Sequence, residues 1–290
     1  MKVILGPASK QLGEKIAELL NVKTIQVASK SFPDGELYIR LEDSLQDEEA
    51  VIVQTTSPPQ DTKLLQLALL TDAAKRNGAT KITAVIPYLA YARQDRIFLK
   101  GEALSIETIA RMLKAAGVDK MITVNIHQSG ILSKFPFPSE QVSAIPLLAE
   151  YFRDKGYSKA FALAPDEGAM HIAEEATSIL GGECGHLEKH RDRYTGQISM
   201  EKLELEVEGK TVIIFDDIIS SGGTIVEAAK RVKELGARTI CVACVHALLI
   251  GQAESKILEA GVEEIVGTDS VLSKVSKVSL APLIARNLAE

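Results

Sequence analysis

The residues best suited to chemistry gather between positions 212 and 224. Two adjacent carboxylates, Asp216 and Asp217, follow the apolar run Val212–Phe215 and precede a turn, Ser220–Thr224. The apolar run is rich in β-branched residues and predicts a buried parallel strand. Open α/β sheets bind ligands at the carboxyl ends of such strands, so the spacing places both carboxylates where a ligand would lie.

The turn is composed only of hydroxyl-bearing residues and glycines: Ser220, Ser221, Gly222, Gly223 and Thr224. A helical pattern, Ile225–Leu235, follows the turn. Hydroxyls and backbone N–H groups at a helix start favour a phosphate, and glycines let the backbone approach it closely. Because a phosphate would repel the two carboxylates, they address neutral hydroxyls or a cation. Ribose 5-phosphate has this layout, with a phosphate at one end and a 2,3-diol at the other. A ligand-free strand–turn–helix would explain the two glycines, but not two ionisable residues that end an apolar strand.

A second turn of unusual composition lies in the first half of the chain. The segment Phe32–Glu36, with the sequence FPDGE, connects two strand-like pieces, Thr24–Ala28 and Leu37–Leu41. Its Pro, Asp and Gly have ordinary turn roles. Those roles do not explain an exposed Phe before the Pro, or a carboxylate on either side of the Gly.

Arg93 and Gln94 follow a further predicted strand, Lys81–Pro87. A guanidinium is suited to bidentate contacts with phosphate or to stacking on a base. The alternative is that Arg93 forms a surface ion pair with Asp95 or Glu102. Two aromatic residues and an apolar strand immediately before Arg93 favour a binding role.

Other candidate residues also follow predicted strands: His127 after Met121–Ile126, Asp166 after Ala160–Ala164, and Lys189–Arg193 after Cys184–Glu188. A lone His is more often structural than a ligand. A run of charges is more often a solvated surface, so Lys189–Arg193 is predicted as a charged loop. Since no apolar residue in that run would anchor it, the loop is expected to be mobile without substrates.

Strands alternate with helices along the chain, which is typical of an α/β fold with a mostly parallel sheet. The halves also resemble each other, because AAKR leads into GATKI between Ala73 and Ile82, and into GARTI between Ala228 and Ile240. This favours a duplicated fold of two similar domains, each a mostly parallel sheet flanked by helices. Only the second copy carries the acidic pair and the Gly-Gly turn. The first copy has Gln54–Pro59 there and is predicted to have lost sugar-phosphate binding.

The first domain is expected at residues 1–144, completed by a C-terminal helix at 278–290, and the second at 145–277. Prolines exclude the run Phe135–Pro138 from regular structure, and this run is predicted to lead toward the second domain.

Composition narrows the class of protein. The chain has 290 residues, 46% of them hydrophobic and only 4% aromatic. A net charge of −6 argues against a nucleic-acid-binding surface, and no long apolar run predicts a membrane span. Cys241 and Cys244 lie in an apolar strand pattern, where burial is a better reading than zinc or redox chemistry. Nothing indicates disulfides, so the expected location is the cytoplasm.

The ordered set of motifs resembles the ribose-phosphate pyrophosphokinase (phosphoribosyl pyrophosphate synthase) family, which has the type I phosphoribosyltransferase fold. The resemblance runs nearly end to end and rests on these segments: Phe32–Glu36, Tyr91–Arg96, Lys100–Ser105, His127, Pro165-Asp166, Lys189–Arg191 and Asp216–Thr224. It implies an enzyme of nucleotide biosynthesis that uses Mg²⁺ to transfer the diphosphoryl group of ATP to the 1-hydroxyl of ribose 5-phosphate. The products would be phosphoribosyl pyrophosphate and AMP.

The resemblance also implies roles for individual residues. Lys189 and Arg191 match the catalytic residues, and His127 and Asp166 match the metal residues. ATP would be bound by Phe32, Asp34, Gly35, Glu36, Arg93, Gln94 and His127. Ribose 5-phosphate would be bound by Arg191, Asp216, Asp217, Ser220, Ser221, Gly222, Gly223 and Thr224. The Phe32–Glu36 hairpin reaches a neighbouring subunit in the family, which implies a homo-oligomer, at least a dimer.

Three positions depart from the family pattern. Ser220-Ser221 stands where the family often has Asp-Thr, and Asn125 and Gly130 replace an Asp before His127 and a Gln after it. Two alternatives stay open at this point. A phosphoribosyltransferase shares the central motif but usually needs only one such domain. A non-catalytic regulatory paralogue would be expected to lack the catalytic or metal residues.

Overall fold

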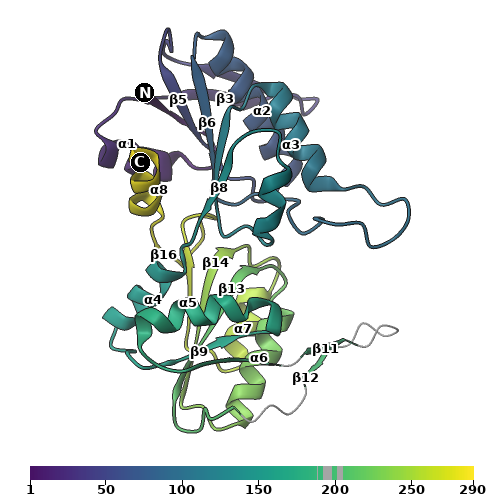
Figure 1. The fold of residues 1–290 in the computed structure, drawn as a ribbon, viewed down its shortest axis with the longest axis vertical. Coiled ribbons are helices and arrows are strands. Elements are labelled where there is room, and N and C mark those ends of the chain that lie inside the picture. The colour runs from purple at the N-terminus through teal and green to yellow at the C-terminus, as the bar shows by residue number, and fades with distance from the viewer. Residues whose placement is uncertain (188, 192–197, 201–204) are drawn as a thin grey trace. The chain divides into compact units, whose positions relative to one another are not determined.

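The computed structural model describes residues 1–187, 189–191, 198–200 and 205–290. The chain forms two compact units (Figure 1): unit 1 comprises Met1–Ser143 and Ser279–Glu290, and unit 2 comprises Ala144–Val278. Each unit has its own core of buried, mostly aliphatic side chains. Among the described helices, none is both long enough and apolar enough to cross a membrane.

A six-stranded sheet with parallel pairing and the order β2-β1-β5-β6-β7-β8 forms the centre of unit 1. Its strands are β1 (Lys2–Leu5), β2 (Thr24–Ile25), β5 (Glu49–Val53), β6 (Lys81–Ile86), β7 (Lys120–Val124) and β8 (Ser139–Val142). Its helices are α1 (Lys10–Leu20), α2 (Gln60–Arg76), α3 (Ser105–Ala116), the 3-10 helix η1 (Ser129–Lys134) and α8 (Ala281–Ala289). The central strands are continuous buried aliphatic runs, as expected where helices cover both faces of a sheet.

Unit 2 has a second six-stranded parallel sheet, with the order β10-β9-β13-β14-β15-β16. Its strands are β9 (Phe161–Ala164), β10 (Cys184–His186), β13 (Thr211–Ile219), β14 (Thr239–Ala247), β15 (Glu264–Thr268) and β16 (Ser276–Val278). Its helices are α4 (Ile145–Asp154), the 3-10 helix η2 (Glu167–Ala169), α5 (Met170–Leu180), α6 (Gly223–Glu234) and α7 (Ala253–Glu259). Cys241 and Cys244 are buried in β14, as the sequence predicted.

The two sheets repeat one topology, which confirms the predicted pair of similar α/β folds. Strand for strand, β2-β1-β5-β6-β7-β8 corresponds to β10-β9-β13-β14-β15-β16. The two sequence echoes occupy equivalent places, at the ends of α2 and α6 and the starts of β6 and β14. The C-terminal helix α8 packs on α1 and β8, as α4 packs on α5 and β16. Helix α8 therefore supplies to unit 1 the helix that precedes the first strand in unit 2.

Each unit also carries a hairpin between equivalent strands. Strands β3 (Val27–Ser31) and β4 (Leu37–Leu41) lie between β2 and β5, and β11 (Lys189–Arg191) and β12 (Ile198–Met200) lie between β10 and β13. Both hairpins are antiparallel and separate from the six-stranded sheets. Figure 1 shows β11 and β12 projecting from the rest of unit 2. Phe32–Glu36 and Lys189–Arg191, which the sequence singled out as candidate site segments, thus belong to equivalent hairpins of the duplicated fold.

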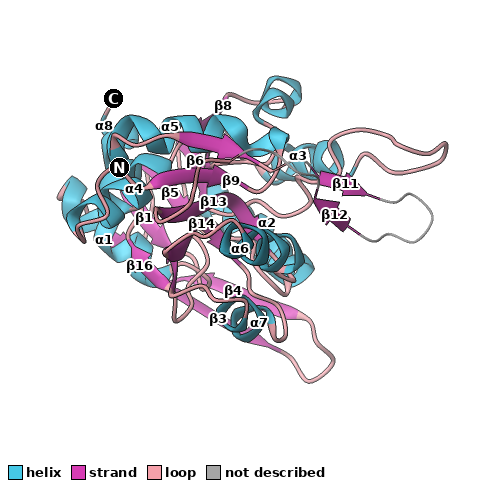
Figure 2. Ribbon diagram, turned by 90° about the horizontal axis from the view of Figure 1, so that it is seen from below, coloured by secondary structure: helices cyan, strands magenta, loops and turns pink. Residues whose placement is uncertain are grey.

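The direction of the connections reverses at one place in each sheet. Helix α1 leads from β1 back to the edge strand β2, whereas α2 leads from β5 the other way to β6. Because such crossovers are right-handed, the two helices cover opposite faces, and Figure 2 shows helices on both sides of the strands. The reversal between β9 and β13 in unit 2 is the topological switch point, where open α/β sheets bind ligands.

Some predicted elements need correction. Lys189–Arg191, predicted as a loop, forms strand β11, because its backbone pairs with Ile198–Met200; positions 192 and 193 lie outside the described residues. The predicted strand Thr24–Ala28 divides at position 26, with β2 in the sheet and β3 in the hairpin. Phe135–Pro138 is irregular, as predicted, but leads first to β8, which returns to the sheet of unit 1.

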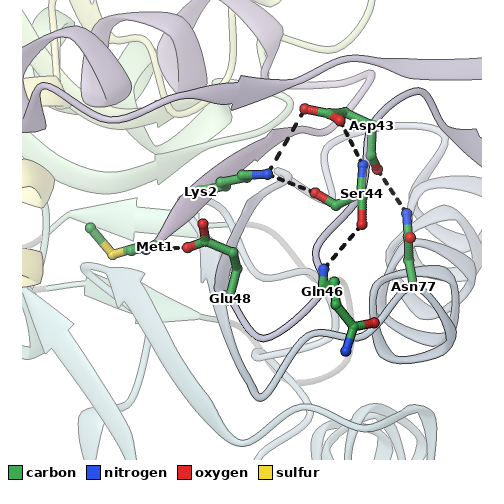
Figure 3. Close-up of polar contacts among 7 residues, drawn as sticks. All are labelled: Met1, Lys2, Asp43, Ser44, Gln46, Glu48 and Asn77. Atoms are coloured by element: carbon green, nitrogen blue, oxygen red, sulfur yellow. Dashed lines mark hydrogen bonds and ion pairs between the residues drawn. The ribbon is translucent and has the colours of Figure 1, made fainter.

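Polar contacts fasten the return from the β3–β4 hairpin to the sheet of unit 1 (Figure 3). The amino group of Met1 lies 2.8 Å from Glu48 Oε2, and Lys2 Nζ lies 3.9 Å from Asp43 Oδ2. Asn77 Nδ2, at the end of α2, donates to the Asp43 carbonyl at 2.8 Å. These exposed ion pairs stabilise the fold little by themselves. They fix where the segment between β4 and β5 meets β1.

Candidate active site

Unit 2 places carboxylates at its switch point. Strand β9 stops before Asp166, whereas its neighbour β13 continues through Asp216 and Asp217 to Ile219. The sequence predicted that the carboxylates end the strand, but β13 keeps its pairing with β14 as far as Ile219 and loses only its pairing with β9. The carboxylates therefore lie on a strand that is still paired with β14, at the point where its other neighbour, β9, has ended.

The environment of Asp216 disfavours its charge. Asp216 is partly buried, and burial is the first cause that raises the pKa of its carboxyl well above the ordinary value. The charge of Asp217, a hydrogen bond with it, and the charge of Asp166 raise that pKa further. Side chains that repel one another at the end of a sheet are typical of functional sites rather than of packing.

The turn after β13 is held from outside and open toward solvent. The Ser220 carbonyl accepts a hydrogen bond from the Ile250 N–H at 2.9 Å. Gly222 has a φ of +78°, and a Cβ there would lie 3.1 Å from the Ile257 side chain, so both conformation and packing require glycine. Gly223 begins α6, is exposed, and has no heavy atom within 4 Å of a Cβ built on it. The helix start and its hydroxyls thus border free space.

The equivalent turn of unit 1 is filled by its own side chains. The polar residues Gln54 to Ser57 are all buried. Gln54 Oε1 accepts from the Ala8 N–H at 3.0 Å, and Thr56 Oγ1 accepts from the Ala90 N–H at 2.8 Å. Polar groups that already have internal partners have little capacity left for a sugar phosphate. This supports the prediction that only the second copy binds one.

The β3–β4 hairpin presents an aromatic ring at its tip. Phe32 is 41% exposed and packs edge-to-face against Tyr38, with ring centroids 6.2 Å apart. Lys30 Nζ lies 4.8 Å from the centroid of Phe32 and 5.3 Å from that of Tyr38. Lys30 and Tyr38 are cross-strand partners, so the ladder itself brings the cation to both rings. A ring held this way offers a stacking surface to a base.

The turn at the tip of the hairpin is stabilised by the carboxylate of Asp34. Asp34 Oδ1 accepts a hydrogen bond from the Glu36 N–H at 3.1 Å, and the Phe32 N–H donates to the Glu36 carbonyl at 2.7 Å. Gly35 takes a φ of +94°, which the turn requires. Asp34 thus has a structural role at the tip, while both carboxylates stay exposed.

Arg93 and Gln94 lie in the segment that follows β6 in unit 1. Tyr91 has a φ of +66°, a left-handed conformation that is rare for an aromatic residue and is typical of functional segments. Arg93 is exposed, and in the described part of the chain it forms no ion pair with Asp95 or Glu102, so the alternative role for it is not seen. Gln94 Nε2 donates to the Arg96 carbonyl at 3.1 Å and lies 3.4 Å from Glu102 Oε2.

His127 is exposed just beyond the end of β7. Nearby Asn125 takes a φ of +36°, which Asn tolerates better than most residues, and its Nδ2 donates to Ser143 Oγ at 3.3 Å. Among the described residues, no three His, Cys, Asp or Glu side chains converge on a common metal position.

Lys189 and Arg191 are at the two ends of β11, where their backbones pair with Met200 and Ile198. The sequence had singled out both residues.

Sequence reasoning missed three residues of the candidate site. Lys30 and Tyr38 pack beside Phe32, and Glu102 contacts Gln94. The sequence could have indicated that Lys30 and Tyr38 lie opposite each other, because cross-strand partners follow from the register of the hairpin. No pattern of spacing reveals which groups one carboxylate binds within a loop.

Comparison with known proteins decides between the remaining alternatives. Residues 1–117 match the N-terminal domain of ribose phosphate pyrophosphokinase, and residues 141–277 match the phosphoribosyl transferase domain. The chain is 42% identical over 289 residues to the ribose-phosphate pyrophosphokinase of Methanothermobacter thermautotrophicus, covering 98% of each chain. It is 41% identical to that of Methanopyrus kandleri, covering 98% of this chain and 97% of the other.

The chain belongs to the ribose-phosphate pyrophosphokinase family. It is an enzyme of that family, a ribose-phosphate diphosphokinase, and the resemblance seen in its motifs is confirmed. A solved structure agrees: phosphoribosylpyrophosphate synthetase from Mycobacterium smegmatis is 28% identical, with a TM-score of 0.88 over 100% of this chain and 97% of that one. The match to the family's N-terminal domain separates this diphosphokinase from phosphoribosyltransferases built on one such domain.

Proposed function

We propose that this diphosphokinase transfers the diphosphoryl group of ATP to the 1-hydroxyl of ribose 5-phosphate, and that its two units divide the substrates. Unit 2 takes ribose 5-phosphate, and unit 1 supplies the contacts to ATP. The observation that carries this division is the contrast between equivalent turns. In unit 2 the turn at Gly223 borders free space, whereas in unit 1 the polar groups from Gln54 to Ser57 are buried against internal partners.

Ribose 5-phosphate fits the layout at the end of β13. Ser220, Ser221, Gly222, Gly223 and Thr224 surround the start of α6, where N–H groups and the helix dipole favour the 5-phosphate. Asp216 and Asp217 precede this turn and accept hydrogen bonds from the 2- and 3-hydroxyls. Hydroxyls are neutral donors, so they satisfy carboxylates that repel one another and would repel a phosphate.

ATP is assigned to the carboxyl-end segments of unit 1 and to its hairpin. Phe32 offers a ring to the adenine, and Asp34 and Glu36 on either side of Gly35 accept hydrogens from its amino group. The rest of the nucleotide is assigned to Arg93 and Gln94, which follow β6, and to His127, which follows β7. The guanidinium of Arg93 belongs to an exposed residue and is suited to bidentate contacts with phosphate.

Mg²⁺ is the assigned cofactor. Asp166 of unit 2 is assigned as a metal ligand through a carboxylate oxygen, the ligand type that Mg²⁺ prefers. His127 of unit 1 is assigned separately as a metal ligand through a ring nitrogen. Mg²⁺ takes few protein ligands and keeps several waters, which agrees with isolated candidate ligands rather than a closed cage. When bound, the ion neutralises charge on the phosphates.

Lys189 and Arg191 are assigned to the transition state. Diphosphoryl transfer needs positioning and charge neutralisation more than covalent work by the protein. Cations on a projecting hairpin can close over the transferred group, and Arg191 would also contact ribose 5-phosphate. The attacking group is the 1-hydroxyl, and AMP is the leaving group.

The reaction is tested by incubating the enzyme with ATP, Mg²⁺ and ribose 5-phosphate and measuring AMP. We expect AMP and phosphoribosyl pyrophosphate in equal amounts, with none when ribose 5-phosphate is omitted. A phosphoribosyltransferase would instead consume added phosphoribosyl pyrophosphate when given a free base. A regulatory paralogue would form no product in either assay. Repeating the assay with inorganic phosphate or ADP tests the consequence of Asn125 and Gly130.

We further propose a homo-oligomer in which the Phe32–Glu36 hairpin completes the ATP site of a neighbouring subunit. Asp34→Ala subunits and Lys189→Ala subunits, each inactive alone, should then recover part of their activity when mixed and allowed to exchange, because some hybrid sites contain neither change. Activity is measured as AMP formation, and subunit exchange is followed with two affinity tags. Proven exchange without any recovery would rule out a shared site.

A further inference from the structure

The side chain of Glu102 organises the segment after β6 in unit 1. Its Oε2 atom accepts from the Phe98 N–H at 2.7 Å and from the Leu99 N–H at 2.9 Å, and lies 3.4 Å from Gln94 Nε2. The Leu99 carbonyl in turn accepts from the Glu102 N–H at 3.2 Å. One carboxylate oxygen therefore joins the tip of the loop to Gln94.

These hydrogen bonds favour the ionised form of Glu102. The Leu99 N–H, then the Phe98 N–H, lower the pKa of this carboxyl, and the Gln94 amide contributes in the same direction. The carboxylate is therefore charged at neutral pH. It gathers three donors from a segment that has little else to hold it: Phe98 is 59% exposed and Leu99 is 70% exposed.

The contacts of Gln94 settle which way its amide points. Nε2 can donate two hydrogens, and its two neighbours are the Arg96 carbonyl and the Glu102 carboxylate, which only accept. Exchanging the amide nitrogen and oxygen would place Oε1 against both acceptors. These two contacts use Nε2, so the amide atom that they leave for another partner is the acceptor Oε1.

We propose that Glu102 is a positioning residue for ATP binding, which orients Gln94 so that its Oε1 accepts a hydrogen bond from a donor group of the nucleotide complex. The donors available are the amino group of the base, the ribose hydroxyls and metal-bound water. A phosphate oxygen only accepts and is excluded as the partner of Oε1. This inference rests on the proposed assignment of Gln94 to the ATP site.

The test compares single variants by their Michaelis constants. Gln94→Ala and Glu102→Ala should each raise KM for ATP by about tenfold, while KM for ribose 5-phosphate stays unchanged. The double variant should be no worse than Gln94→Ala, because Glu102 acts through Gln94. Glu102→Gln keeps an acceptor for the loop amides and should remain near wild type. Asp72→Ala, which removes an exposed carboxylate of α2 in the same unit, is the matched control.

An exchange of the two side chains separates orientation from general support of the loop. Gln94→Glu places a second carboxylate against Glu102 and should raise KM for ATP by about tenfold or more. Adding Glu102→Gln restores one donor and one acceptor between the positions, so part of the affinity should return. A merely structural role of Glu102 predicts no such recovery.

The outcomes distinguish two failures. If Gln94→Ala leaves KM for ATP unchanged, the assignment of Gln94 to the ATP site is wrong. If Gln94→Ala raises KM but Glu102→Ala does not, or if the effects of the two changes multiply in the double variant, the positioning role of Glu102 is overturned. An equal rise in KM for ribose 5-phosphate would also overturn it, because the defect would then not be confined to ATP.

Discussion

Lys189→Ala should lower kcat by about 10²–10³ while KM for ATP changes little. A cation that acts mainly on the charge of the transition state contributes little to the ground-state complex, so its loss appears in kcat. The measurement is steady-state AMP formation with both substrates varied in turn. Arg191→Ala should lower kcat similarly and, because this residue is also assigned to ribose 5-phosphate, should raise KM for that substrate.

The matched control for Lys189→Ala is His190→Ala, since His190 lies in the same strand and has no assigned role. The double variant of Lys189 and Arg191 should be less impaired than the product of the single effects, because one hairpin carries both cations. The contrary pattern is a raised KM for ATP with kcat preserved. That result would show that these residues only bind substrate.

The fold was accessible from the sequence where local patterns and the duplication agreed. The apolar run before Asp216 and the echo between Ala73 and Ala228 point to the same βαβ unit in both halves, and β5–α2–β6 and β13–α6–β14 are that unit. Strand ends were less accessible, because they depend on neighbours. Pairing with β14 extends β13 beyond the two carboxylates to Ile219, and no residue type within β13 predicts this extension.

The candidate site was accessible from the sequence in its residue types but not in its supporting contacts. A run of charges such as Lys189–Arg191 has no strand pattern of its own, and its backbone becomes a strand by pairing with β12. Lys30 gains its place beside Phe32 only through the register of the hairpin. Glu102 was one of two possible ion-pair partners in the alternative role considered for Arg93, but its carboxylate binds backbone amides. Such choices depend on three-dimensional neighbours.

Asp216→Asn should weaken the binding of ribose 5-phosphate and stabilise the fold. Loss of a charge-assisted hydrogen bond to a ribose hydroxyl should raise KM for ribose 5-phosphate roughly 10- to 100-fold, with KM for ATP nearly unchanged. Asn is neutral without binding a proton, so it avoids the unfavourable burial and the repulsion from Asp217 and Asp166 that raise the pKa of Asp216. The melting temperature without substrates or metal should therefore rise by about 2–4 °C. A change that impairs binding yet stabilises the fold marks a residue kept for function.

Two further variants serve as comparisons for Asp216→Asn. Glu234→Gln removes an exposed carboxylate from α6 and should alter neither KM nor melting temperature. Thr224→Ala, which removes a hydroxyl from the phosphate turn, should raise KM for ribose 5-phosphate more than KM for ATP. If Asp216→Asn or Thr224→Ala weakens both substrates equally, the proposed division of substrates between the units fails.

The glycines of the turn test whether a phosphate occupies the space at the start of α6. Gly223→Ala adds a methyl group that, apart from its chain neighbours and the backbone of its own helix, has no protein atom within 4 Å, so the fold should accept it. A phosphate bound there would meet that methyl group, and KM for ribose 5-phosphate should rise with stability unchanged. Gly222→Ala instead forces a left-handed φ of +78° on a residue packed against Ile257, and should cost about 1–2 kcal/mol of stability. An unchanged KM in Gly223→Ala would mean that the 5-phosphate binds elsewhere, and that the open turn is only the start of a helix.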